Sequence, residues 1–115
     1  MMTDESVQII TAADQDTDFE VRVHEVFELS LPAKPTTGHL WEIVDQPDAV
    51  AIESWRWDPE GIDPYEPAAL DIPIFRVWRM HATEAGEFEL TFRCWQPWEG
   101  ESSIADTFHV FIEAT

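Results

Sequence analysis

The chain has 115 residues, which is enough for one domain with one hydrophobic core. Hydrophobic residues make up 44% of it and six are tryptophan, so the composition argues against disorder despite a net charge of −18. Because 24 acidic residues face six basic ones, the surface repels nucleic acid and anionic lipid, and neither is expected as a partner. General solubility or adaptation to high salt explains this acidity better than electrostatic steering toward a basic partner.

The ends of the chain and its single cysteine limit the cellular setting. Residues 1–5 are polar and expected to be frayed. They lack the basic region followed by an apolar region that is typical of a signal peptide. A cytoplasmic location is therefore expected unless a leader has been removed, and a monomer is favoured. Cys94 is the only cysteine, which excludes an internal disulfide, and its place in an alternating strand predicts a buried structural thiol.

Short segments of alternating apolar and polar residues recur along the chain, as is typical of β-strands. The expected strands cover residues 7–11, 19–24, 27–31, 40–44, 50–57, 74–82, 87–95 and 107–113. Val7 and Ile9 carry the alternation of the first strand, and a shift of phase near Glu25 and Val26 indicates a bulge or a break. Seven or eight such strands without a long helix predict a single all-β domain over residues 1–115, an immunoglobulin-like antiparallel β-sandwich.

Three proline-rich loops, residues 32–39, 58–73 and 96–106, separate these strands. In immunoglobulin strand order they are the B–C, D–E and F–G loops, which emerge at the same end of a sandwich. The first loop contains Pro35-Thr36-Thr37-Gly38, in which the proline stiffens a tip that bears two hydroxyls and Gly38 permits φ > 0. An ordinary turn is the plain alternative for this segment, but together the loops predict one contiguous edge.

The F–G loop contains Gln96-Pro97-Trp98-Glu99, a second proline-stiffened tip. An aromatic residue at such a place either caps the end of the sandwich or is an exposed anchor for a partner, since tryptophan buries a large area with little loss of entropy. Trp41 and Trp78 are expected in the core. The positions of Trp55, Trp57 and Trp95 stay open.

Catalytic and metal sites are not indicated. His24, His39, His81 and His109 are scattered, without short metal-ligand spacing. His39 and Glu42 are three positions apart in a strand and so point to opposite faces. There is no serine in a nucleophile elbow and no glycine-rich phosphate loop. We therefore expect neither an enzyme nor a cofactor or a bound metal.

The two loop motifs resemble those of a known family. Pro35-Thr36-Thr37-Gly38, followed by Trp41, is similar to the Asn-Pro-Thr-Thr-Gly-x-x-Trp loop of the chagasin-type inhibitors of papain-like cysteine peptidases, and Pro97-Trp98 is similar to their Arg-Pro-Trp loop. The strand from Gly86 to Pro97 also has the family's spacing, and the similarity covers roughly residues 20–114. The resemblance implies an immunoglobulin-like fold, in agreement with the strand pattern.

The resemblance also implies a mechanism and a set of binding residues. The three loops would form a wedge in the substrate cleft of the peptidase, where Thr36 and Thr37 reach the catalytic Cys/His pair without a covalent bond. Trp98 would lie on the primed side of the cleft. The 58–73 loop would run along the unprimed side as an extended substrate does. The implied contact residues are Pro35, Thr36, Thr37, Gly38, Ala68, Ala69, Leu70, Gln96, Pro97, Trp98 and Glu99.

The chain departs from the family pattern at several positions. Lys34 stands where asparagine is common, Cys94 where tyrosine is usual, and Gln96 in place of arginine, which removes a forked cationic donor. The Gly-x-Gly-Gly of the family's D–E loop is absent, and Gly61 is the only glycine there. Because glycine permits close backbone approach, we predict a weaker or different contact on the unprimed side.

A non-inhibitory module is the alternative. It would use the same tryptophan-rich edge to bind another protein or a glycan. An exposed, coplanar pair of tryptophans would favour a glycan, whereas a single tryptophan at a tip would favour a protein.

Overall fold

The computed structural model describes residues 7–33, 38–63 and 72–115. Its strands are β1 (Gln8–Thr11), β2 (Asp18–Val21), β3 (Val26–Pro32), β4 (Leu40–Val44), β5 (Val50–Asp58), β6 (Phe75–Ala82), β7 (Gly86–Trp95) and β8 (Asp106–Ala114). The described residues also include two 3₁₀ turns, η1 (Ala12–Asp14) and η4 (Glu101–Ser103). The prediction of an all-β chain is confirmed. Over these ranges no helix has the length and apolarity needed to cross a membrane.

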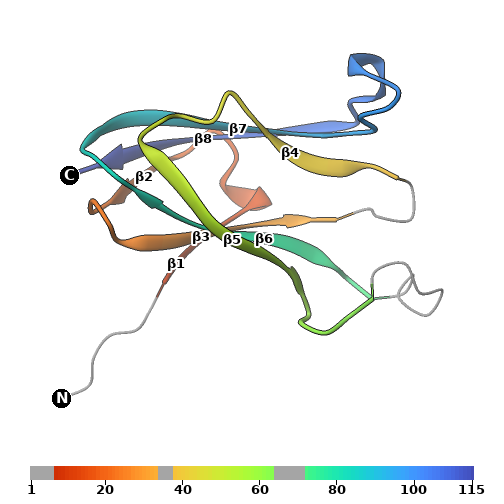
Figure 1. Ribbon diagram of the computed structural model, residues 1–115, viewed down its shortest axis with the longest axis horizontal. Helices are drawn as coiled ribbons and strands as arrows, with labels where there is room; N and C mark the ends of the chain where they lie inside the picture. The colour runs from red at the N-terminus through yellow and green to blue at the C-terminus, as the bar shows by residue number, and fades with distance from the viewer. Residues whose placement is uncertain (1–6, 34–37, 64–71) are drawn as a thin grey trace.

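The strands form two four-stranded sheets that lie face to face (Figure 1). One sheet has the order β1-β3-β6-β5 and the other β2-β8-β7-β4. β1 pairs with β3, and β2 with β8, in parallel, while the other pairs are antiparallel. β1 and β2 follow one another in the chain but join different sheets, so the N-terminal segment links both layers. This arrangement agrees with the expected immunoglobulin-like sandwich.

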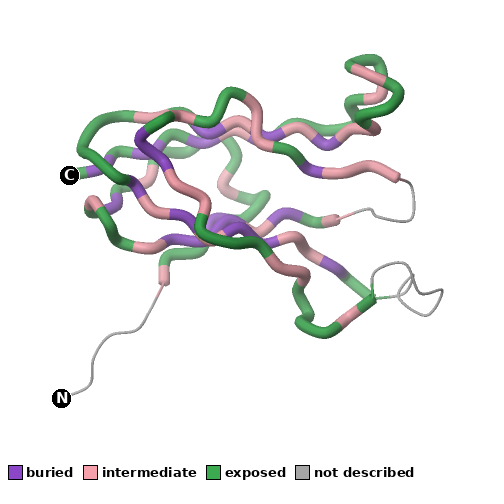
Figure 2. Tube along the Cα trace, viewed as in Figure 1, coloured by how far each residue is buried: buried purple, intermediate pink, exposed green. Residues whose placement is uncertain are grey.

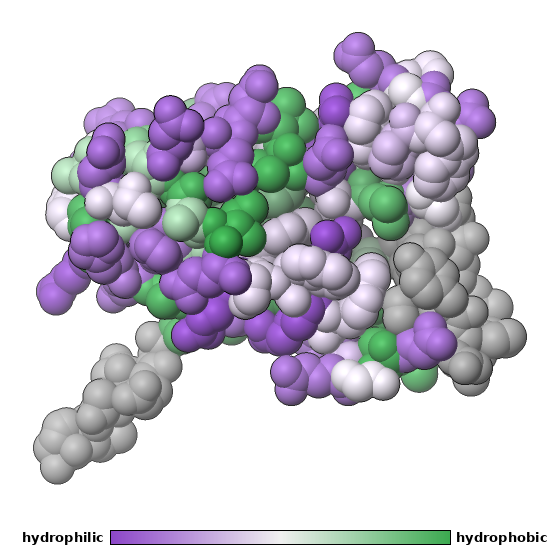
Figure 3. Space-filling model, viewed as in Figure 1, coloured by the Kyte–Doolittle hydropathy of each residue, from purple (hydrophilic) through white to green (hydrophobic). Residues whose placement is uncertain are grey.

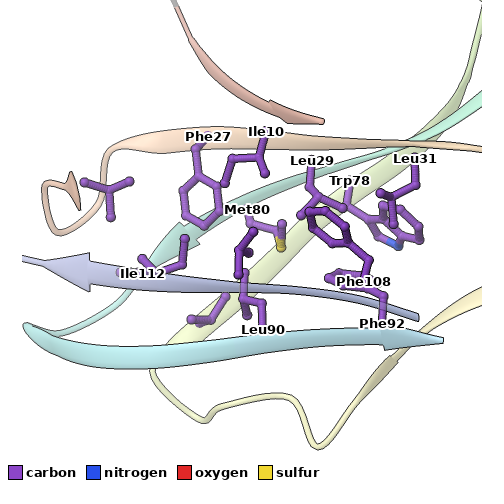
Figure 4. Packing of buried hydrophobic residues seen from close by; sticks show 14 of the residues in the cluster. Ile10, Phe27, Leu29, Leu31, Trp78, Met80, Leu90, Phe92, Phe108 and Ile112 are labelled. Atoms are coloured by element: carbon purple, nitrogen blue, oxygen red, sulfur yellow. The ribbon is translucent and has the colours of Figure 1, made fainter. Parts of the chain in front are cut away.

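The core lies between the inner faces of the two sheets, and along β7 and β8 buried residues alternate with more exposed ones (Figure 2). Phe27, Leu29 and Leu31 of one sheet face Leu90 and Phe92 of the other (Figure 4). These five side chains are fully buried, each stabilising the fold by roughly 1.5–3 kcal/mol relative to exposure.

Three expectations about the core are confirmed. Trp41 and Trp78 are buried, and the ring of Trp78 packs 4.8 Å from that of Phe92, centroid to centroid. Cys94 is a buried thiol outside any disulfide, since the chain has a single cysteine. Its burial excludes the exposed setting that thiolate chemistry needs.

The N-terminal strands differ from the expectation. Ile10, not Ile9, enters the core, because the parallel register places Ile10 beside buried Leu29 of β3. β2 ends at Val21, not at residue 24, since His24 has a φ of 70° within a turn. The expected interruption is confirmed as a break, because β3 then begins at Val26.

The outer face of the β1-β3-β6-β5 sheet holds a buried carboxylate with two cationic partners. Glu28 is only 6% exposed and accepts two hydrogen bonds from Arg56, at 2.9 and 3.2 Å. Arg79 donates a third, at 3.2 Å. The hydrogen bonds from Arg56 lower the pKa of Glu28, and those from Arg79 add to the effect. The three side chains join β3, β5 and β6 through a charge-assisted network.

The outer face of the β2-β8-β7-β4 sheet instead brings carboxylates next to one another. Glu20, Glu113 and Glu87 stand directly across from one another on β2, β8 and β7. In the next row Phe111, 37% exposed, lies between Asp18 and Glu89. A hollow of about 740 Å³ is lined mostly by these side chains. We call this surface the acidic face, formed by Asp18, Glu20, Glu87, Glu89, Phe111 and Glu113.

His109 borders the acidic face. Its Nδ1 lies 3.0 Å from Asp16 and its Nε2 lies 3.1 Å from Glu89. The hydrogen bond that His109 donates to Asp16, and after it the one that it donates to Glu89, raise the pKa of His109 above its ordinary value of 6.5.

Candidate functional site

The described parts of the three loops lie at one end of the sandwich (Figure 1). Gly38, residues 58–63 and residues 96–105 are far apart in sequence but share this end, which we call the rim. The prediction that the loops emerge together agrees with this placement of their described parts. Among the expected contact residues, Pro35, Thr36, Thr37, Ala68, Ala69 and Leu70 lie outside the described residues.

Hydrogen bonds fix both stems of the B–C loop. The indole Nε1 of Trp41, at the start of β4, donates to the carbonyl of Pro32, the last residue of β3, over 2.7 Å. The amide of Ala33 donates to the carbonyl of Ile74 over 2.8 Å. Buried Trp41 therefore holds together the two strands from which this loop emerges.

The F–G tip is stabilised by its own hydrogen bonds. The amides of Glu99 and Gly100 both donate to the carbonyl of Gln96, at 2.9 and 3.2 Å, which closes a turn around Pro97 and Trp98. Across the base of the loop, the amide of Ala105 donates to the carbonyl of Cys94 over 2.8 Å. The tip thus projects from a loop whose backbone groups are largely paired.

Ser103 adds a brace that the sequence analysis missed. Its Oγ accepts a hydrogen bond from the amide of Gln96 at 2.9 Å and donates to the carbonyl of Gly100 at 2.6 Å. One hydroxyl therefore joins the two ends of the tip that carries Trp98. A lone serine in a polar loop gives no sequence signal of this role, because the contact depends on the fold of the loop.

Trp98 is 66% exposed and lies against Gly38 of the B–C loop. A Cβ placed on Gly38 would lie 3.0 Å from Cη2 of the indole and 3.6 Å from Nε2 of Gln96. Gly38 also has a φ of 78°, which side chains disfavour. Of the two alternatives for Trp98, the exposure of its ring argues against a buried cap, and its contact with Gly38 places it beside the neighbouring loop.

The rim has the chemistry of a binding surface. Among residues 7–33, 38–63 and 72–115, no cluster of three or more His, Cys, Asp or Glu side chains could hold a metal ion. The carboxylates of Asp58, Glu60, Glu99 and Glu101 give the described rim a negative character. A rigid aromatic tip with polar neighbours is typical of a protein-interaction surface.

Comparison with solved structures supports the fold. The cysteine protease inhibitor EhICP2 from Entamoeba histolytica superposes with a TM-score of 0.77 at 15% identity, covering 95% of each chain. Amebosin gives 0.74 at 17% identity, covering 96% of this chain and 99% of the other. PbICP-C, solved in complex with falcipain-2, gives 0.61 at 12% identity over 94% and 99%.

Comparison with protein sequences identifies the family. A search of curated proteins found no match to this sequence. The model of the chagasin family peptidase inhibitor I42, however, matches residues 20–112, which include both loop motifs. The members of that family are peptidase inhibitors and not enzymes. The chain therefore belongs to the chagasin family of peptidase inhibitors.

Proposed function

We propose that this protein is a reversible, non-covalent inhibitor of papain-like cysteine peptidases and blocks their active-site cleft with its rim. The exposure of Trp98 on a braced tip, within a chain of the chagasin family, is the observation that carries this proposal. A rigid tip loses little conformational entropy on binding, which favours tight association. The solved complex of PbICP-C with falcipain-2 supports a peptidase as the partner.

In this proposal each of the three loops contacts a different part of the cleft. Pro35, Thr36, Thr37 and Gly38 approach the catalytic Cys/His pair, and the threonine hydroxyls supply hydrogen bonds there. Inhibition without turnover follows if no scissile carbonyl lies at attack distance from the nucleophile.

The other two loops flank this central contact. The tip formed by Gln96, Pro97, Trp98 and Glu99 covers the primed side of the cleft. Ala68, Ala69 and Leu70 of the D–E loop lie on the unprimed side. Their contact contributes less than the family's glycine-rich loop, because close backbone approach is restricted.

Titration of papain and a cathepsin L-type peptidase with the purified protein tests the proposal. We expect slow, tight and fully reversible inhibition, with the inhibitor recovered uncleaved from the complex. Replacement of Thr37 by tryptophan should weaken inhibition by crowding the catalytic pair. The absence of inhibition at micromolar protein across several papain-like peptidases would reject the function and leave the fold unaffected.

The glycan-binding alternative gains no support from the tryptophan geometry. Trp55 and Trp57 are neighbours on β5, but their rings meet edge to face at an interplanar angle of 90°. A flat sugar-stacking platform needs coplanar rings. Trp98 instead projects singly from the tip, as expected for a surface that binds protein.

A further inference from the structure

A second exposed tryptophan, Trp55, lies on β5 at the edge of its sheet. We call the surface formed by Trp55, Trp57 and Arg76 the flank. Trp55 is 50% exposed although it belongs to β5. An irregularity of the pairing between Ile52 and Ser54 shifts the alternation of this strand. As a result Trp55 pairs with buried Trp78, Trp57 pairs with Arg76, and Arg56 instead faces Glu28 on the outer side. The bulge thus turns two tryptophans toward the space between the sheets.

Arg76 holds Trp55 in place. The guanidinium carbon of Arg76 lies 4.2 Å from the centroid of Trp55, 5.3 Å from that of Trp78 and 5.9 Å from that of Trp57. Such cation–π contacts order side chains that would otherwise be mobile. Tryptophan and arginine are also the residues most enriched in interface hot spots. The ring of Trp55 is therefore both accessible and fixed.

A hollow links this flank to the rim. A hollow of about 290 Å³ opens between β4 and the facing sheet, and its walls include Leu40, Ile43, Arg76, Trp78, Trp95 and Pro97. Arg76 thus contacts Trp55 and also lines the hollow, while Pro97, on its opposite side, directly precedes Trp98. Figure 3 shows hydrophobic and nearly neutral residues gathered between the sheets at this end, among hydrophilic surroundings.

We propose that the peptidase bound at the rim also contacts this flank, placing an apolar side chain from a surface loop beside its cleft against Trp55, next to Arg76 of the hollow. The inference rests on the proposed function and adds a contact outside the three loops. The partner is the same peptidase because one hollow is lined both by Arg76, which contacts Trp55, and by Pro97, which directly precedes Trp98 of the rim. Since loops beside a cleft vary more than the cleft itself, Trp55 selects among related peptidases.

The test compares Trp55→Ala with Trp55→Phe and Phe111→Ala in inhibition of a panel of papain-like peptidases. Phe111 is the matched control, because it is an exposed aromatic residue on the other sheet. We expect Trp55→Ala to raise the inhibition constant by about tenfold or more, mainly through faster dissociation, for at least one peptidase. Trp55→Phe should recover most of the loss, and Phe111→Ala should equal the wild type.

A second measurement does not depend on the folding of a variant. In hydroxyl-radical footprinting of the wild-type complex, Trp55 should be protected and Phe111 should react as in the free protein. If Trp55 is not protected in the complex, this inference is wrong while the proposed function stands. The same holds if Trp55→Ala has the wild-type inhibition constant for every peptidase that the wild type inhibits. Protection of Trp55 in the free protein at high concentration would assign the flank to a second copy and overturn it too. If the wild type inhibits none of the panel, both the proposed function and this extension are wrong.

Discussion

The rim and the acidic face each expose an aromatic ring, but they surround it differently. Trp98 rests on Gly38 at a tip whose backbone is closed by hydrogen bonds. Phe111 belongs to a strand and stands between Asp18 and Glu89, beside a row of three glutamates. A partner that covered Phe111 would have to desolvate several carboxylates, whereas Trp98 projects beyond its charged neighbours. Exposure of an aromatic residue therefore does not by itself mark a binding site.

The charges of the molecule also differ between its two outer faces. Beneath the flank, Glu28 is paired with Arg56 and Arg79, which ties together the strands that carry Trp55 and Arg76. On the acidic face, Glu20 and Glu87 both stand opposite Glu113, an unfavourable arrangement for a sheet. The buried charge pairs thus stabilise the sheet that supports the flank, whereas the row of glutamates weakens pairing on the acidic face.

The largest expected effect separates the two aromatic residues. Trp98→Ala should weaken binding to an inhibited peptidase by about 100-fold, or roughly 3 kcal/mol, since it removes the central anchor. Phe111→Ala should change the affinity less than about twofold. Surface plasmon resonance measures both, and equal losses for the two variants would contradict the distinction between rim and acidic face.

The paired charges give the next largest effect, on stability. Glu28→Gln should lower the free energy of unfolding by about 1–3 kcal/mol, because a buried carboxylate with three charge-assisted hydrogen bonds is lost. Since Arg56 lowers the pKa of Glu28, this contribution is present above pH 4.5 and is lost as the pH falls through the lowered pKa. Urea unfolding measures it. Glu42→Gln, which breaks the exposed pair with Arg93, is the matched control and should cost less than about 1 kcal/mol.

The brace within the rim gives a smaller effect, and on binding. Ser103→Ala removes the hydroxyl that joins Gln96 to Gly100, so the free tip should become more mobile. We expect inhibition to weaken about fivefold, which corresponds to about 1 kcal/mol, through slower association or faster dissociation. Ser102→Ala changes an exposed neighbour in the same turn and should leave the inhibition constant unchanged. Equal inhibition constants for the two serine variants would show that the hydrogen bonds of Ser103 do not contribute to binding.

The smallest effect concerns His109 at the border of the acidic face. Because Asp16 and Glu89 raise its pKa, protonated His109 stabilises the folded state. This contribution is complete below the ordinary pKa of 6.5 and is lost as the pH rises through the raised value. The wild type should therefore exceed His109→Gln in unfolding free energy at about pH 5.5 and lose that advantage by about pH 8.5. If the wild type stays more stable than His109→Gln at the higher pH, or if the difference does not change with added salt, this explanation is wrong.

The strand pattern carries most of the fold. Alternation places Phe27, Leu29 and Leu31 of β3 in the core because each lies in a long strand with one buried face. It fails for β1, where four residues hold two adjacent isoleucines and only the parallel pairing with β3 decides which one is buried. The alternation of apolar residues therefore cannot predict which isoleucine is buried, because this depends on the register between β1 and β3.

The candidate site is predictable to a similar degree. Loop chemistry leaves Trp98 either as a cap or as an exposed side chain, and the family resemblance implies the exposed one, in which the structure places it. Ser103, and the fixing of Trp55 by Arg76, remain hidden in the sequence. The first depends on a loop that folds back on itself, and the second on a bulge that inverts the facing of β5 after Ile52. Both arise from tertiary structure and leave no periodic signal.

The ends of the strands also decide how the molecule can be tethered. β1 begins and β8 ends at the end of the sandwich away from the rim (Figure 1). A tag, a fused domain or a sensor surface attached at either terminus therefore leaves the rim pointing outward. Copies joined in tandem through those termini would each present an unobstructed tip, so a bivalent form should gain avidity toward clustered or immobilised targets without any change in the tip itself.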